Sequence, residues 1–270
     1  MGKHYIPQYL LRGFTYEGKL FVFDKVNARW FSSQPKSVAN EADLWPDEIE
    51  TYITETVEEP ARLAIERLRQ KQDLTEQDRL SLARYIAYLW KRVPAGRERF
   101  RNSLPEVAEK IRSDLNSRLA SEEQRLKANA YIDKIIAEPP PGLWHDSMKT
   151  QFRRDVAGTI ANMSWKILHT ERPDFLTSDN PVFFFSSDGL GRLTSELTLP
   201  LASRAALVGS HIAEGALRHM SATPSQVREI NRRTVTNATR FVFSEVMEPW
   251  LTPFVQKVHT PIRGSLVRDR

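Results

Sequence analysis

The stretch DFLTSDNPVFFF, residues 174–185, places a polar turn between two short apolar segments. Asp, Asn and Pro favour turns, because short polar side chains bond nearby backbone and the proline ring fixes φ. The flanking segments, near residues 175–177 and 182–186, have the composition of buried β-strands. Thr177, Ser178, Asp179 and Asn180 add two hydroxyls, a carboxylate and an amide, which is more hydrogen-bonding chemistry than a plain turn requires.

Further β-strands are predicted on both sides of this stretch. Residues 19–24 alternate apolar and polar side chains, and residues 29–33 can return beside them as a hairpin. Similar patterns predict strands near 193–200, 205–212 and 240–244.

The middle of the chain has the apolar spacing of helices. From residue 47 apolar side chains recur with a period of about 3.6, and Pro60 should kink or divide the first helix. Thr75 opens a second helix that ends near Pro94. Residues 104–135 are predicted to form one long helix with charges of both signs on its outer face.

A proline tract at residues 139–142 breaks the helical pattern and predicts a stiff connector. Beyond it, residues 144–167 keep an apolar spacing of three or four, which predicts a core helix. Thr223 followed by Pro224 predicts the start of a last helix, which should extend to about residue 238.

Helices and strands occur in blocks rather than in strict alternation, which predicts an α+β fold. We expect one domain of residues 1–270, with a mixed or antiparallel sheet built from the N-terminal hairpin and the C-terminal strands. In one arrangement these strands form a single sheet. Residues 47–138 would then form a largely helical layer or insert, with the connector at 139–142.

Composition excludes several kinds of site. The chain of 270 residues has no cysteine, which excludes disulfides, thiolate nucleophiles and cysteine-based zinc or iron–sulfur sites. It has neither a P-loop nor a GxGxxG motif. The net charge of +5 is spread along the chain, so it permits nucleic-acid binding without arguing for it. With no signal-peptide pattern and no apolar run of about 18 residues, the expected location is cytoplasmic, away from membranes.

Five segments occur in an order that resembles the bacterial family catalogued as domain of unknown function 4238. They are HYIPQYLLRGF, KLFVFDK, FLTSDNPVFFF, LTLPLASRAALVG and REINRRTVTNATRFVFS. The resemblance covers roughly residues 3 to 245 and implies a cytosolic prokaryotic protein, some of whose relatives lie among antiphage defence genes. It brings no established catalytic residues. The residues that match the family's marks are His4, Pro7, Gln8, Thr177, Ser178, Asp179, Asn180, Pro181 and Asn231.

Three of these residues are candidates for catalysis. His4 could act as a general base or a metal ligand, because histidine titrates near neutral pH. Asp179 could hold a divalent metal such as Mg²⁺ or orient a histidine, and Asn180 could donate to a developing oxyanion. Substrate binding would fall to four polar neighbours: Gln8, Thr177, Ser178 and Asn231.

The same residues also have a structural interpretation. Asp179 and Asn180 would close an Asx-type turn, and His4 would bond a backbone carbonyl to hold the N-terminus in place. Separately, the arginines at 228, 232, 233 and 240 form the best local basic cluster, which could contact phosphates.

Two functions are consistent with this pattern. The first is an antiphage effector enzyme, a hydrolase or nuclease acting on a phosphate-containing substrate such as a nucleic acid or a nucleotide. The second is a non-enzymatic module in which the same groups recognise a ligand or a partner such as a phage component. The mixed-charge helical region 97–136 could supply a surface for a partner or for a homo-oligomer.

Overall fold

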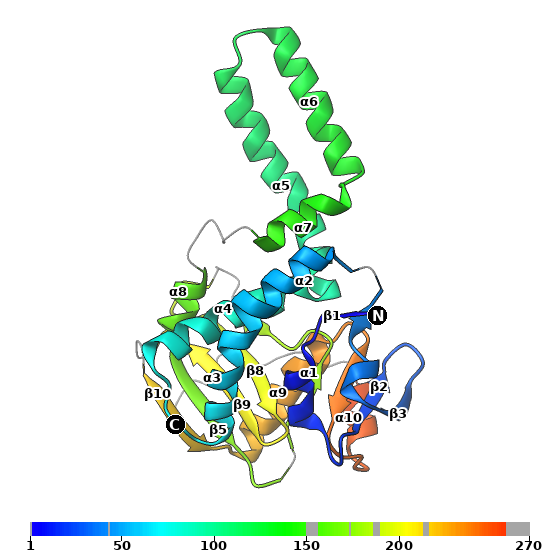
Figure 1. Ribbon diagram of the computed structural model, residues 1–270, viewed down its shortest axis with the longest axis vertical. Coiled ribbons are helices and arrows are strands. Elements are labelled where there is room, and N and C mark those ends of the chain that lie inside the picture. Colours follow the sequence, from blue (N-terminus) through cyan, green and yellow to red (C-terminus); the bar gives the residue numbers. More distant parts are fainter. Residues whose placement is uncertain are drawn as a thin grey trace.

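The computed structural model of the chain describes residues 2–42, 44–149, 156–172, 174–185, 190–212 and 216–257. It shows a body of two main β-sheets covered by helices, from which one pair of helices projects (Figure 1). The chain begins with the short helix α1 (Gln8–Leu11) and the 3₁₀ turn η1 (Arg12–Phe14), and a second 3₁₀ turn, η2 (Pro35–Ser37), follows the first hairpin.

The N-terminal hairpin joins C-terminal strands in a four-stranded antiparallel sheet with the order β3-β2-β11-β6. Its strands are β2 (Leu20–Asp24), β3 (Arg29–Ser33), β6 (Thr177–Ser178) and β11 (Phe241–Ser244). Two further short strands, β1 (Lys3–His4) and β4 (Asn40–Glu41), pair with each other.

The second main sheet has five strands in the order β10-β5-β9-β8-β7. They are β5 (Ser164–His169), β7 (Phe183–Phe185), β8 (Glu196–Ala202), β9 (Ala205–Ser210) and β10 (Leu217–Ser221). All neighbours are antiparallel except β5 and β10, which run parallel. The α+β prediction is confirmed, but the strands divide between two main sheets instead of forming one, because β6 pairs with β11 whereas β7 pairs with β8.

The helices of the middle region follow one another closely. They are α2 (Asp47–Ile53), the π-helical turn η3 (Thr54–Glu58), α3 (Glu59–Arg69), α4 (Glu76–Arg92), α5 (Pro94–Arg118), α6 (Glu122–Ala137), α7 (Pro141–Lys149) and α8 (Val156–Ala161). Two helices lie in the C-terminal part, α9 (Pro224–Asn237) and α10 (Leu251–Gln256). The description of residues 47–138 as a separate helical insert stays a prediction.

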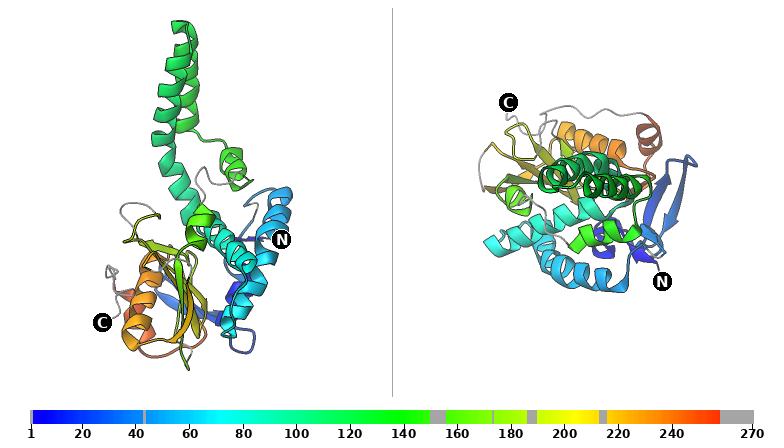
Figure 2. Two further views of the ribbon diagram at one scale, coloured as in Figure 1. Left: turned by 90° about the vertical axis from the view of Figure 1, so that its left-hand side faces the viewer. Right: turned by 90° about the horizontal axis from the view of Figure 1, so that it is seen from above.

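The five-stranded sheet lies between helices on both faces, with α3 and α4 on one side and α9 on the other (Figure 2). The side chains of strand β8 explain why helices cover both faces of the sheet. Leu197, Leu199 and Leu201 are fully buried in the main core with the helices α3 and α4. Glu196 lies on the alternate face of the strand and bonds Arg233 of α9, so both faces of this strand are buried.

Three helix signals in the sequence are confirmed. The π-helical turn η3 ends at Glu58, and Pro60 then lies in the first turn of α3. Thr75 and Thr223 cap α4 and α9, and each forms a reciprocal capping box with the residue three positions later.

The prediction of one helix over residues 104–135 is wrong. The chain reverses between α5 and α6, where the backbone at Leu119 leaves the helical region, with ψ of 124°. The reversal brings Leu104 and Ala108 of α5 and Ile132 of α6 to low exposure, which a single straight helix in solvent could not do.

The prediction of a helix over residues 144–167 is also wrong at its C-terminal end, and residues 150–155 lie outside the described ranges. Residues Ser164–His169 form β5, which is paired on both sides, with β9 and with β10. The buried side chains of Met163 and Ile167 fit helical spacing, and those of Trp165 and Ile167 fit the strand period of two. Pairing with distant segments decides between the two structures.

Along the described ranges, every helix is too short or too polar to traverse a lipid bilayer.

A buried ionic cluster joins α9 to the five-stranded sheet. The Arg233 guanidinium donates to Glu196 Oε2 on β8 at 2.6 Å and to Glu229 Oε1, one helical turn away, at 3.1 Å. Its side chain is fully buried, and the carbon Cζ lies 5.3 Å from the ring centre of Phe183 on β7. One buried arginine therefore bridges two carboxylates of this interior, and Arg232 lies 3.5 Å from the second oxygen of Glu229.

We expect Arg233→Leu to lower the free energy of unfolding by about 3–5 kcal/mol, because it leaves the buried Glu196 without the guanidinium that it bonds. Urea denaturation followed by circular dichroism measures this loss. The matched control is Arg62→Leu on α3, the same substitution at an arginine that is 53% exposed and pairs with the exposed Glu59. The control should cost under about 1 kcal/mol, and equal losses for the two variants would contradict a special role for the cluster.

Candidate functional site

The polar turn of residues 177–181 is the corner at which the chain passes from one main sheet to the other. Strand β6 ends at Ser178 in the four-stranded sheet, and β7 begins at Phe183 in the five-stranded sheet. The Asp179 carboxylate, at the corner, accepts hydrogen bonds from the backbone amides of Thr239, Arg240 and Phe241 at 2.8, 2.7 and 3.0 Å. Asp179 therefore fastens the corner to the segment that enters β11.

The electrostatics of Asp179 combine two opposed effects. Burial raises the pKa of the Asp179 carboxyl, while the three amides and the Lys25 ammonium work against that rise. The residue itself is 3% exposed. In the part of the chain that the structure describes, no group of three or more acidic or histidine side chains is arranged to hold a metal ion. The metal-binding role of Asp179 stays a prediction.

Asn180 and Asn231 also bond backbone. The side-chain amide of Asn180 donates to the backbone carbonyl of Asn237 at 2.9 Å. The side-chain amide of Asn237 donates to the backbone carbonyl of Asn180 at 2.6 Å. Asn231 accepts from the Leu176 amide at 2.9 Å and donates to the Asp174 carbonyl at 2.7 Å. Both asparagines thus attach the segment before and after the corner to helix α9.

The two hydroxyl residues of the turn are fully buried. Ser178 Oγ accepts from the backbone amide of Asn180 at 3.2 Å, which closes a local turn. Thr177 Oγ1 is buried without a hydrogen-bond partner among the described residues, as is Asn180 Oδ1. The structure therefore brings together five of the predicted site residues, whose side-chain hydrogen bonds go to backbone groups: Thr177, Ser178, Asp179, Asn180 and Asn231.

His4 and Gln8 lie elsewhere. They line a cavity of about 370 Å³ with Glu58 and Arg92, and none of the described residues lining it comes from the corner. His4 Nε2 donates to the carbonyl of Lys36 at 3.2 Å, the backbone bond expected under the structural interpretation. Their catalytic and binding roles stay predictions.

Within the N-terminal motif, Tyr5 is affected electrostatically by Asp179. Its side chain is 6% exposed, and burial, reinforced by the charges of Asp179 and Glu41, raises the pKa of the Tyr5 hydroxyl. The charge of Asp179 thus acts on Tyr5, which the sequence-based proposal did not include among the site residues.

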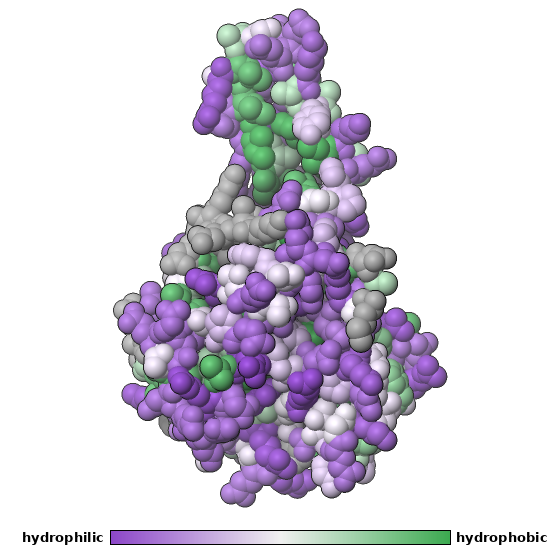
Figure 3. Space-filling model, in the orientation of Figure 1, coloured by the Kyte–Doolittle hydropathy of each residue, from purple (hydrophilic) through white to green (hydrophobic). Residues whose placement is uncertain are grey.

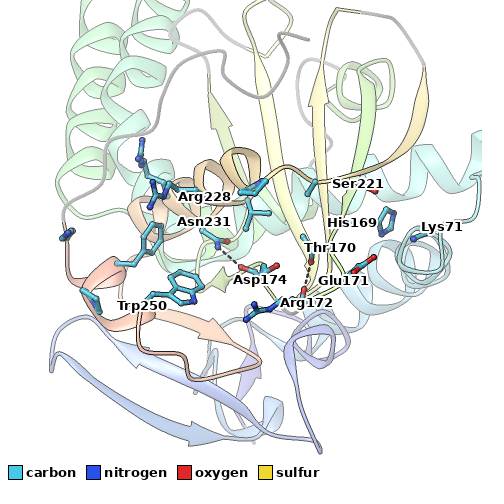
Figure 4. A pocket seen from close by; sticks show the side chains of 17 residues that line it. Lys71, His169, Thr170, Glu171, Arg172, Asp174, Ser221, Arg228, Asn231 and Trp250 are labelled. Carbon is cyan, nitrogen blue, oxygen red and sulfur yellow. Dashed lines mark hydrogen bonds between the residues drawn. The ribbon is translucent and has the colours of Figure 1, made fainter. Parts of the chain in front are cut away.

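A larger cavity, of about 1030 Å³, opens on another side of α9. It lies among α9, α10, the segment after α3 and the carboxyl ends of the parallel strands β5 and β10, and we call it the basic groove. In Figure 4, Arg228, Asn231 and Trp250 lie on one side of it, and Lys71 and His169 on the other.

Positive charge dominates the described lining of the basic groove. Five cationic residues, namely Lys71, Arg172, Arg228, Arg232 and Lys257, line it with two acidic residues, Glu171 and Asp174, a net charge of 5 − 2 = +3. Arg172 is paired with Glu248 at 2.9 Å and Arg232 with Glu229 at 3.5 Å. Arg228 and Lys71 form no ion pair within the described ranges, so their charges are available to a ligand.

A histidine pair lies at the edge of the basic groove. His169, at the end of β5, and His219, on β10, stack with ring centres 5.2 Å apart, and His169 Nε2 lies 2.9 Å from His219 Nδ1. His219 Nε2 lies 3.1 Å from the carbonyl oxygen of Gln72. Burial, together with the charges of His219 and Lys71, lowers the pKa of His169 to about 4.

These contacts assign the ring protons of the neutral pair. A carbonyl only accepts, so His219 Nε2 carries a proton and donates it to Gln72. His219 Nδ1 then accepts from His169 Nε2, which leaves the lone pair of His169 Nδ1 able to take up a proton.

A comparison with protein families places this geometry in context. The family model described as "Protein of unknown function (DUF4238)" matches residues 3–246. The chain belongs to the DUF4238 family. Searches of curated proteins and of solved structures found no match.

The basic groove of this DUF4238 protein was only partly visible in the sequence. Arg228 and Arg232 stood out because they are one helical turn apart. His169 and His219 are 50 positions apart and carry no motif. Only the parallel pairing of β5 with β10, which sets Ser221 beside His169, brings the two rings together.

Alanine substitutions at Asp179 and His4 test whether Asp179 stabilises the corner between β6 and β7. Asp179→Ala removes a buried carboxylate that accepts from three backbone amides, and we expect it to lower the free energy of unfolding by about 3 kcal/mol or more. His4→Ala removes one partly exposed bond and should cost under about 1 kcal/mol. Urea titrations of both variants measure these losses. Unchanged stability of Asp179→Ala would contradict the fastening role and would favour a purely functional carboxylate.

Proposed function

We propose that the protein binds a phosphate-containing ligand in the basic groove. The observation that carries the proposal is the convergence of five cations and only two acids on one cavity. Arginine and lysine are the side chains that recognise phosphate, by paired hydrogen bonds and by charge. Arg228 on α9 and Lys71 after α3 lack ion-pair partners among the described residues and are the first candidates to contact it.

Helix α9 adds to this field. Pro224, its first residue, lines the basic groove, so the positive end of the helix dipole lies at the cavity. An anion bound there would gain from the helix end as well as from the arginines.

The size and aromatic content of the basic groove favour a nucleotide within this ligand class. Its volume of about 1030 Å³ is at the upper end of the range for small-molecule sites. Trp250 and Phe254 both line it, with ring centres 5.6 Å apart in an edge-to-face arrangement. Trp250 is 39% exposed, so a nucleobase could stack on its indole while the phosphates lie toward the cations.

Arg228→Ala is expected to weaken binding of ATP or pyrophosphate at least about tenfold, because a charge-assisted bond to phosphate contributes roughly 1.5–3 kcal/mol. Isothermal titration calorimetry measures the change. The matched control is Arg118→Ala on α5, which removes another exposed arginine, one that does not line the basic groove, and should leave the affinity unchanged. Wild-type protein that binds none of the phosphate probes would overturn the proposal.

Hydrolysis of the bound ligand is a second candidate, and the histidine pair favours it. In this scheme His169 Nδ1 takes a proton from a water molecule whose oxygen attacks phosphorus. The bond from phosphorus to the leaving oxygen breaks, and that oxygen leaves with its electron pair or takes the proton from His169. The protein would then be a phosphohydrolase or a nuclease. If it binds without cleaving, the same groove would serve a ligand sensor.

The histidine pair gives hydrolysis a distinctive pH profile. His169→Gln should lower the hydrolysis rate by about 10²–10⁴-fold while ligand affinity stays within a few-fold. Because the pKa of His169 is lowered to about 4, the wild-type rate should persist at pH 5 and fall only near pH 4. Lys71→Met removes a repelling charge, so it should move this acid limb to higher pH. An unchanged rate in His169→Gln would rule out the base and leave the sensor.

The family resemblance supplies a biological setting for either activity. We propose that the protein acts in antiphage defence, with a phage component as the trigger of the effector or as the partner of the sensor. This part of the proposal is supported by the resemblance, whereas the basic groove supports the ligand class.

A further inference from the structure

The helices α5 and α6 form an arm that projects from the body of the protein. Figures 1 and 2 show the two helices running side by side, away from both main sheets. They are joined by residues 119–121, and Arg112 of α5 pairs with Asp133 of α6 at 2.6 Å.

The seam between these two helices buries little apolar surface. Leu104 and Ala108 on α5 and Ile132 on α6 are buried, each with 7–8% exposure. Farther along the seam, Asn116 Oδ1 and Asn129 Oδ1 are buried without a hydrogen-bond partner among the described residues. Isolated helices are marginal in water and draw most of their stability from packing of an apolar face. The arm therefore gains little from its own seam.

One face of the arm remains apolar and exposed. Figure 3 shows an apolar band that runs lengthwise over α5 and α6. On α5, Val107 and Ile111 are one helical turn apart and 38% and 41% exposed, and Ile111 follows the buried Leu104 by seven positions. On α6, Tyr131 is 67% exposed. An exposed apolar band of this kind marks an interaction surface.

We propose that the arm is a homodimerisation element, in which this apolar face packs against the same face of a second copy to form a four-helix bundle. A two-fold interface is built from the same patch of both copies, so an apolar band meets an apolar band. Because the arm stands clear of both sheets, a second copy can approach it without displacing the body of the protein (Figure 2).

The charges of the arm fit a second copy better than a nucleic acid. Cations of the arm are paired with acids one helical turn away on the same helix, as in Lys110–Glu106, Arg118–Asp114 and Lys127–Glu123. The arm therefore presents both signs along its length, and two copies can meet without a repelling field. A nucleic acid would require an unpaired basic stripe.

The dimensions of the arm limit the interface area and therefore the affinity expected for the dimer. Two helices side by side are about 20 Å wide, and the 16 residues of α6 extend for about 24 Å. A flat face of these dimensions has an area of roughly 480 Å², which is smaller than the ~800 Å² per partner of a standard stable interface. We therefore expect a modest dimer whose population depends on concentration.

Sedimentation equilibrium of the full chain, from about 1 µM to about 500 µM, tests the proposal, because this range brackets a modest affinity. Wild-type protein should pass from monomer to dimer, and Tyr131→Glu should shift the midpoint at least about tenfold upward, because it buries a charge in the apolar face. Circular dichroism confirms that the variant keeps its helices. A monomer throughout the range would overturn the proposal.

Leu126→Glu is the matched control. Leu126 is 65% exposed on the same helix, but five residues before Tyr131, which is about 140° around the helix. It should leave the midpoint unchanged, and an equal shift in both variants would contradict the assigned face.

A cross-linking experiment provides a second measurement. Because the chain has no cysteine, Ile111→Cys introduces a single thiol. A short bifunctional thiol reagent should join two copies of Ile111→Cys and should leave Leu126→Cys largely unlinked, and the reverse pattern would overturn the proposal.

Discussion

The three hydrogen bonds that the Asp179 carboxylate accepts from consecutive backbone amides are the constraint on which the arrangement of the body depends. It holds the corner between β6 and β7 against the start of β11, and so fixes how one main sheet follows the other. The side-chain amides of Asn180 and Asn237 each donate to the other residue's backbone carbonyl, which joins the same corner to the end of α9. Polar residues are concentrated here because the chain changes sheets in a buried place, where each exposed backbone group needs a partner.

Helix α9 connects this scaffold to the basic groove. Asn231 holds the segment before β6, and Arg233 joins the helix to β8 through two buried carboxylates. Arg228, on the same helix, extends instead into the basic groove. Arg233, which joins the helix to the sheet, is thus distinct from Arg228, which is proposed to contact the ligand, so substitution at these two positions can separate stability from binding.

Much of the architecture was predictable because it rests on local signals. Alternating patterns located the hairpin and the C-terminal strands, and Thr75 and Thr223 marked helix starts that their capping boxes confirm. The predictions over residues 104–135 and 144–167 were wrong where the local pattern allowed two structures. A turn at residues 119–121 carries no glycine or proline, and β5 takes its form from two partner strands distant in sequence.

The sequence by itself determined the α+β class, the family and the presence of a polar cluster at residues 177–180, since each can be recognised from individual segments of the chain and their order. Only the tertiary structure decided what that cluster contacts, because its partners at 231 and 237–241 lie some 50 to 60 positions away. The same holds for the histidine pair and the basic groove. Their charges converge because strand pairing and helix packing bring together side chains that no spacing in the sequence relates.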